Sequence, residues 1–162
     1  NKERSSTALA ADLGGLASNI YLWDCELVDM TDHVKLLSSN KYPSALIKMQ
    51  RNSRERHVAD EMEREAAIYS ELMENTDVKK AIAVFHGFST HLGVPILCLG
   101  LEGPDFEDIG VENLPHELKV SAAECLQLLN QAGLLHHDLA LRNIVQSKEN
   151  PKQAKIIDFG RA

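Results

Sequence analysis

The sequence predicts an α+β fold, in which antiparallel strands and separate helices follow one another along a single chain of 162 residues. Short apolar runs bounded by turn residues predict three strands, at 45–49, 81–88 and 94–101. The segment 89–93 is short enough to join the last two strands as a hairpin. Apolar residues spaced three and four apart predict two helices, at 53–74 and 115–132.

The N-terminal part is less regular. Residues 1–12 form a polar segment, and 13–19 contain a Gly-Gly pair. The run 20–23, Ile-Tyr-Leu-Trp, has β-type composition, so we expect a turn leading into a strand. Segment 24–42 is mixed and predicts no element.

A charged pair is expected between the strand at 45–49 and the helix at 53–74. Glu65 lies in the apolar stripe of that helix, and a buried carboxylate is costly unless it is paired. The preceding strand carries one cation, Lys48. We therefore expect Lys48 to pair with Glu65, which would make it a fixed point charge suited to phosphates.

Oxygen-bearing side chains gather at the other end of the chain. Runs 144–146 and 155–157 predict a hairpin across the turn-rich segment 147–153. If Gln146 pairs with Lys155, Asn143 lies opposite Asp158, and Asp138 lies in the loop that feeds the hairpin. Hard oxygen ligands of this kind suit Mg²⁺.

The composition restricts the possible functions. The 17 Lys and Arg against 24 Asp and Glu give a net charge of −7, which leaves no basic surplus for non-specific nucleic-acid binding. The longest apolar runs are shorter than a membrane span, and the start of the chain lacks the pattern of a signal peptide. Three scattered cysteines indicate a reduced, intracellular (cytoplasmic) protein with buried thiols.

Four segments resemble, in order, the motifs of the protein kinase-like family. Ala45-Leu46-Ile47-Lys48 is similar to the strand whose lysine pairs with nucleotide phosphates, and Glu65 to the helix glutamate that holds that lysine. His-His-Asp-Leu-Ala-Leu-Arg-Asn at 136–143 resembles the catalytic loop. Asp-Phe-Gly at 158–160 resembles the magnesium-binding triplet.

The resemblance implies a kinase-like fold and a division of roles. A five-stranded antiparallel lobe with one long helix would cover 13–102, and a truncated second lobe of one helix, the loop and the hairpin would cover 103–162. ATP with Mg²⁺ would lie in the cleft between the lobes. Asp138 would position or deprotonate the acceptor hydroxyl, and Asn143 and Asp158 would hold Mg²⁺. Lys48 would hold the phosphates, and Glu65 would orient Lys48.

The same resemblance implies an adenine site. Leu99 would line its back, and Gly100, Leu101 and Glu102 would form the hinge that meets the base. The base would be sandwiched by three apolar residues, Ile20, Leu46 and Val145. For each of these apolar residues, the alternative interpretation is that it simply packs in the hydrophobic core. A stack of Tyr69, Phe85, His136 and Phe159 would form an internal spine.

Several positions depart from the family pattern. The glycine-rich segment matches the family only at Gly15, which would approach the phosphates. Leu46 stands where the family has a small residue, and His137 replaces an arginine. The substrate-binding part of the second lobe is missing. Two interpretations are open: the sequence is a fragment, or it belongs to a trimmed kinase-like class. The closing motif is similar to short fungal kinase-like proteins and small-molecule phosphotransferases. In a trimmed protein, a second copy or a partner chain would complete the lobe.

Two functions therefore remain open. The first is transfer of the γ-phosphate of ATP to a hydroxyl of an unknown protein or small molecule. The alternative is a catalytically silent, pseudokinase-type binding module or effector that acts through a protein partner. Zinc binding by His136, His137 and Asp138 is disfavoured by their spacing. The other histidines are expected to be surface or hydrogen-bonded residues: His33, His57, His86, His91 and His116.

Overall fold

The computed structural model describes residues 15–160, and it divides into two compact units. Unit 1 contains residues 15–70 and 85–100, and unit 2 contains residues 71–84 and 101–160. The expected boundary after residue 102 thus falls after Gly100 instead, and segment 71–84 belongs with the C-terminal part.

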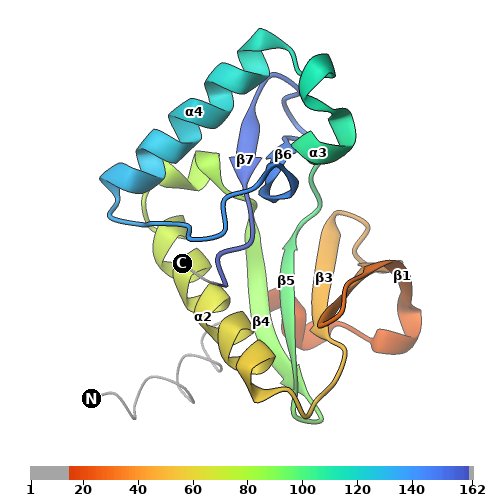
Figure 1. Cartoon of the computed structure of the whole chain (residues 1–162). Coiled ribbons are helices and arrows are strands. Elements are labelled where there is room, and N and C mark those ends of the chain that lie inside the picture. Colours follow the sequence, from red (N-terminus) through yellow and green to blue (C-terminus); the bar gives the residue numbers. More distant parts are fainter. Residues whose placement is uncertain (1–14, 161–162) are drawn as a thin grey trace. The chain divides into compact units, whose positions relative to one another are not determined.

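Unit 1 is built on a five-stranded antiparallel sheet in the order β1-β2-β3-β5-β4 (Figure 1). Its strands are β1 Cys25–Met30, β2 Val34–Ser39, β3 Ala45–Gln50, β4 Phe85–His91 and β5 Val94–Gly100. The α+β class, the strand at β3 and the β4–β5 hairpin are confirmed. Within the predicted run 81–88, however, the strand begins only at Phe85, because η3 (Val78–Ala81) precedes it.

The strand expected at 20–23 is wrong. The chain forms two 3₁₀-helices there, η1 Gly15–Asn19 and η2 Leu22–Asp24. In a 3₁₀-helix, side chains three residues apart share a face. Ala17 lies in η1, and Ile20, the residue after η1, donates its backbone N–H to the Ala17 carbonyl at 3.5 Å. Both residues are buried in the core. The burial of these two residues, three positions apart, therefore determines the local structure more strongly than the β-type composition does.

The two faces of the sheet have different neighbours. On β3, Ala45 and Ile47 point into an apolar core with Ala17 and Ile20. Lys48 points to the opposite face, since successive side chains of a strand alternate. That face meets α2, Arg56–Met73, because Lys48 bonds to Glu65 of this helix. Helix α2 therefore lies where the predicted Lys48–Glu65 pair requires it to lie.

Unit 2 contains the second predicted helix and the second hairpin. Helix α4, His116–Gln131, packs against the hairpin of β6, Ile144–Gln146, and β7, Ala154–Ile156 (Figure 1). Its buried face is as expected: Leu118, Ala122, Cys125 and Leu129. A short helix α3, Phe106–Ile109, and η4, Val111–Asn113, precede α4, and η5, Leu141–Asn143, leads into β6.

The register of the second hairpin differs from the prediction by one residue. Gln146 pairs with Ala154, not with Lys155, and Ile144 pairs with Ile156. Asn143 consequently lies opposite Ile157, whose backbone N–H donates to the Asn143 carbonyl at 2.9 Å. Lys155 is instead drawn toward Glu102, with which it forms a buried ion pair.

In the described part of the chain, none of the helices combines the length and apolarity that crossing a bilayer requires.

Candidate functional site

The predicted pair of Lys48 and Glu65 is present in unit 1. Lys48 Nζ lies 2.8 Å from Glu65 Oε2, and the side chains are 17% and 1% exposed. The backbone of Lys48 is paired on both sides, with Leu36 of β2 and Leu97 of β5. The ammonium group is therefore held at a fixed place, with its charge matched by a buried carboxylate.

A burial of this kind is expensive. Removing two charges from water costs several kcal/mol for each ion, and their attraction does little more than offset it. One turn along α2, Tyr69 stacks on Phe85 with ring centroids 6.1 Å apart and planes at 6°. The stack of Tyr69 on Phe85 packs α2 against β4 near the Lys48–Glu65 pair. The Glu65 side chain therefore has little freedom to move away from Lys48.

The loop before β6 holds Asp138 by hydrogen bonds at both ends. Its backbone N–H donates to His136 Nδ1 at 3.2 Å, and Asn143 Nδ2 donates to its carbonyl at 2.8 Å. His136 Nε2 in turn lies 2.8 Å from the carbonyl of Ile157. With Nδ1 accepting, Nε2 must carry the proton, which assigns the neutral imidazole tautomer.

The carboxylate of Asp138 is also held in place. Arg142 Nη2 lies 3.1 and 3.2 Å from its two oxygens, four residues along the chain. A carboxylate has about four lone-pair positions, so it can bond to Arg142 and still accept a hydroxyl proton. Sequence reasoning missed Arg142 as a site residue, although its i,i+4 spacing from Asp138 was a visible signal.

Two residues of this region have left-handed backbones. His137 has φ +64° and Asp158 has φ +65°. This conformation costs about 1 kcal/mol for a residue with a side chain, and surrounding structure must hold it. Here the bonds from Ile157 to Asn143 and from His136 to Ile157 fix the two segments against each other. The strain therefore lies where the sequence predicts chemistry.

The donor set of this hairpin end is compatible with Mg²⁺. The amide nitrogen of the buried Asn143 is used in the bond to Asp138, so Oδ1 is its ligating atom. Asp158 adds a carboxylate immediately after Ile157. Mg²⁺ prefers one or two such oxygens and completes its shell with water and phosphate.

The residues expected around adenine lie at several places in the two units. Leu46 pairs with Leu99, and Ala45 with Gly100, at the β3–β5 edge in unit 1. Leu101 begins the second segment of unit 2, in which Val145 pairs with Lys155 and is buried. Ile20 is packed in the core of unit 1, which agrees with the alternative that it is a core residue and not an adenine contact.

Glu102 has a structural role that the sequence did not predict. One of its carboxylate oxygens bonds to Lys155 Nζ at 3.0 Å, and the other accepts from the backbone N–H of Lys148. Both charged side chains of the pair are about one-tenth exposed, at 9% and 10%. This contact ties the segment after β5 to the β6–β7 hairpin.

Gly15 is explained by packing within unit 1. Its φ is +42°, and a Cβ at this position would lie 2.5 Å from the carbonyl oxygen of His86 in β4. A side chain is therefore excluded by the close approach of η1 to β4. The preceding residues of the expected glycine loop, Leu13 and Gly14, lie outside the described residues.

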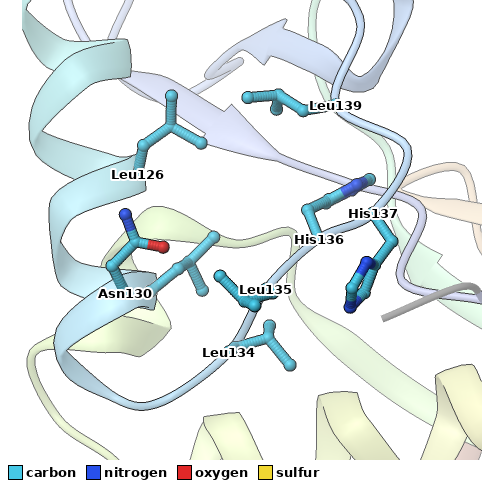
Figure 2. Close-up of a pocket in the computed structure, with 8 residues that line it drawn as sticks. Leu126, Asn130, Leu134, Leu135, His136, His137 and Leu139 are labelled. Carbon is cyan, nitrogen blue, oxygen red and sulfur yellow. The ribbon is translucent and has the colours of Figure 1, made fainter.

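Unit 2 also has an apolar pocket of about 330 Å³ between α4 and the loop that follows it (Figure 2). Leucines form most of its wall, with Asn130 and His137 at polar positions, and its residues are Leu126, Leu129, Asn130, Leu134, Leu135, His136, His137 and Leu139. Asp138, Asn143 and Asp158 are not part of its wall. The pocket is therefore lined by His136, His137 and Leu139 of segment 136–143, but not by the predicted acid–base or metal-binding residues.

Cys98 and Cys125 are buried as the sequence predicts, whereas Cys25 is only partly buried. Burial raises the pKa of Cys98 and of Cys125 to about 11, and raises that of Cys25 by a smaller extent. Cys125 Sγ donates to the carbonyl of Ala154 at 3.2 Å. At neutral pH these groups are thiols, which are poor nucleophiles.

Comparison with known proteins adds no family. No protein-family model matches this chain, and no curated protein matches it. The kinase resemblance therefore rests on the motifs of the sequence.

Proposed function

We propose that the protein is a phosphotransferase of the kinase-like type, which transfers the γ-phosphate of ATP to a hydroxyl acceptor in the presence of Mg²⁺. The observation that carries the proposal is the Lys48–Glu65 pair. A nearly buried ion pair contributes little to stability, since apolar residues of similar size serve as well. A lysine held in place by a carboxylate is, by contrast, well suited to hold a phosphate.

Each residue then has a defined task. Lys48 holds phosphate oxygens, and Glu65 keeps its ammonium group in position. Asn143 and Asp158 are the residues that would hold Mg²⁺, which supplies positive charge against the phosphates when bound. Asp138, aligned by Arg142, accepts the proton of the attacking hydroxyl.

The balance of this reaction is simple. The hydroxyl oxygen of the acceptor forms a bond to the γ-phosphorus, and the bond from that phosphorus to the bridging oxygen breaks. ADP leaves with the electron pair, and the hydroxyl proton goes to Asp138. Since such transfer depends on positioning and charge rather than covalent chemistry, the two ordered groups Lys48 and Asp138 are the ones to test.

A second function is favoured by the packing of Gly15. The 3₁₀-helix η1 packs so closely on β4 that a Cβ on Gly15 would lie 2.5 Å from the carbonyl oxygen of His86. This close packing leaves the segment little freedom to act as a phosphate-covering loop. This feature supports a binding module that retains the nucleotide but does not turn it over, and that acts through a protein partner.

Conversion of ATP to ADP separates these candidates. Wild-type protein with Mg²⁺ and γ-labelled ATP is expected to form ADP and to label itself or an added hydroxyl acceptor. Asp138→Asn should lower this rate by about a hundredfold or more while binding ATP as well as the wild type. Equal rates in wild type and variant would contradict the role of Asp138. ATP binding with no ADP formed would support the silent module.

A further inference from the structure

Three side chains with metal-ligating atoms meet at the surface of unit 1. They are His33, just before β2, Glu55, directly before α2, and His57, in the first turn of α2. Each offers one ligand atom, and these atoms all lie within 4.8 Å of one another. We propose that they form a binding site for a divalent transition metal, with Zn²⁺ as the representative ion.

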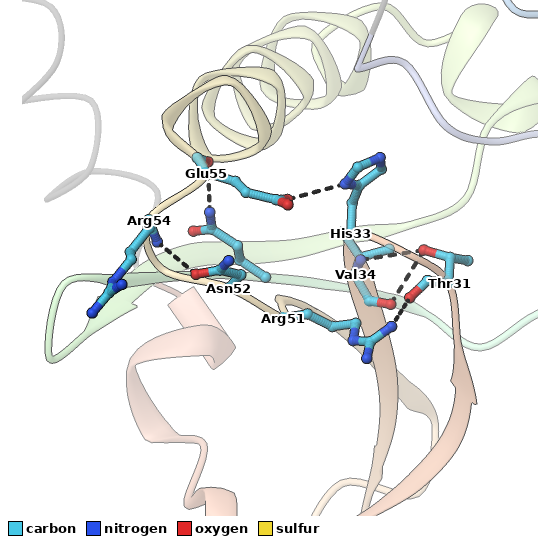
Figure 3. Close-up of polar contacts among 8 residues, drawn as sticks. Thr31, His33, Val34, Arg51, Asn52, Arg54 and Glu55 are labelled. Atoms are coloured by element: carbon cyan, nitrogen blue, oxygen red, sulfur yellow. Dashed lines mark hydrogen bonds and ion pairs between the residues drawn. The ribbon is translucent and has the colours of Figure 1, made fainter.

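The distances are close to those of a coordinated ion. His33 Nδ1 lies 3.0 Å from Glu55 Oε2, as Figure 3 shows. Zn²⁺ binds nitrogen and oxygen at about 2.0–2.2 Å, so two ligands of a tetrahedral ion are about 3.3 Å apart. The rings of His33 and His57 are edge to face with centroids 5.7 Å apart, and both residues are exposed. A small rotation of an exposed side chain therefore brings the third atom into range.

The backbones that carry these ligands are fixed by hydrogen bonds. The carbonyl of His33 accepts from the backbone N–H of Arg51 at 2.9 Å, which extends the β2–β3 pairing by one residue. The carbonyl of Glu55 accepts from Nε2 of the buried Gln50 at 2.6 Å. On the other side, Arg51 Nη1 donates to the carbonyl of Thr31 (Figure 3). The ligands are thus brought together before any ion binds, which lowers the entropic cost of binding.

The chemistry of the site selects the class of ion. The ligands comprise one carboxylate and two imidazoles, while the positive N-terminal end of α2, where Glu55 and His57 lie, opposes a cation. Charge attraction is therefore weak, and binding must come from nitrogen coordination. That favours Zn²⁺, Ni²⁺ or Cu²⁺ and disfavours Mg²⁺ and Ca²⁺, which take oxygen ligands.

A bound ion would connect the start of α2 to the turn before β2. Helix α2 carries Glu65, so the ion would also stabilise the helix that holds Lys48. The proposal does not depend on the phosphotransferase function, because the ligands belong to unit 1 and none of them is a predicted catalytic residue.

Competition between the untagged chain and a zinc-binding dye tests the site. Wild type is expected to bind one Zn²⁺ per chain, with an affinity unchanged by millimolar Mg²⁺. His33→Asn, His57→Gln and Glu55→Gln should each weaken it by about tenfold or more. His116→Gln, at the exposed start of α4, should leave it unchanged. Zn²⁺ should also raise the unfolding temperature of wild type and not that of His57→Gln.

Co²⁺ spectroscopy distinguishes this site from binding by cysteine. A complex with nitrogen and oxygen ligands gives visible d–d bands with no sulfur-to-metal charge-transfer band. Absence of saturable Zn²⁺ binding would overturn the proposal, as would binding that survives all three ligand substitutions. A charge-transfer band lost in Cys25→Ser would also overturn it. Unfolding temperatures measured with a chelator, equal in wild type and variants, exclude a folding defect.

Discussion

Arg142 and Asp138 form a forked contact in which a single guanidinium nitrogen, Nη2, lies 3.1 and 3.2 Å from the two carboxylate oxygens. The arginine side chain is 54% exposed and that of the aspartate 25% exposed. An exposed pair of this kind adds at most about 1 kcal/mol to stability. Its main effect is therefore to fix the direction of the Asp138 carboxylate.

This relationship predicts a variant that is folded but slow. Arg142→Gln should lower the rate of ATP turnover by about tenfold to a hundredfold, because misplacement of a catalytic group is costly, and should change the free energy of unfolding little. Arg142→Lys should recover part of the rate, since it restores a cation. Steady-state kinetics and urea unfolding check both effects. Lys119→Gln, exposed on α4, is the control, and a rate for Arg142→Gln equal to that of the control would contradict the positioning role.

The Lys48–Glu65 pair predicts a non-additive effect on stability. Lys48→Met removes the ammonium bonded to a carboxylate that is 1% exposed and should destabilise the protein by about 3 kcal/mol. Adding Glu65→Leu removes the buried charge as well and should recover most of that loss. Urea unfolding of the two single variants and the double variant measures the coupling. A double variant less stable than Lys48→Met would show that the pair is not the main contact of Glu65.

The chain offers a buried ion pair and an exposed one for direct comparison. Glu102 and Lys155 are 9% and 10% exposed at 3.0 Å, whereas Glu117 and Lys152 are 65% and 77% exposed at 4.0 Å. Glu102→Gln should cost about 3 kcal/mol, because it leaves the Lys155 charge buried without its carboxylate. Glu117→Gln should change stability by less than about 0.5 kcal/mol. Similar losses in the two variants, measured by chemical unfolding, would be inconsistent with this account.

The buried thiols predict a loss of stability at high pH. The pKa of Cys98 and Cys125 is raised by burial to about 11, from 9.0 for an ordinary thiol. Their contribution is complete below pH 9.0 and is lost as the pH rises toward 11, because the unfolded thiols ionise first. Unfolding of wild type and of Cys125→Ala over this range should show a shallower pH slope for the variant. Equal slopes would argue against ionisation of Cys125 as a cause.

The parts of the fold that the sequence predicts are those with periodic burial. Helices α2 and α4 show their buried faces at spacings of three and four, and β3 and β5 are mainly apolar runs next to turn residues. Strand β1 has no such signal, because Glu26 to Met30 are all exposed and neither face is marked by composition. The 3₁₀-helix η1 was missed since its period of three is visible only when the core partners of Ala17 and Ile20 are known.

The candidate site was predictable only in its local parts. Lys48 and Glu65 were found because a carboxylate in an apolar stripe needs a cation. The predicted hairpin register was wrong by one residue, because the composition of segment 147–153 does not specify which residues of the two strands pair. His33 and His57 were expected to be separate surface or hydrogen-bonded residues. The pairing of β2 with β3 brings His33 close to Glu55 and His57 at the start of α2.

The central proposal is that this chain binds ATP with Mg²⁺, with Lys48 and Asp158 among the residues that the proposal requires. The most direct test is thermal unfolding with increasing ATP, with and without Mg²⁺, for wild type, Lys48→Met and Asp158→Asn. A ligand that binds the folded state stabilises it by about 2.7 kcal/mol at a hundredfold excess over its dissociation constant. The account predicts a rise in unfolding temperature for wild type that requires Mg²⁺ and is lost in both variants. No shift of the wild type at millimolar ATP, or an equal shift in all three proteins, would contradict it.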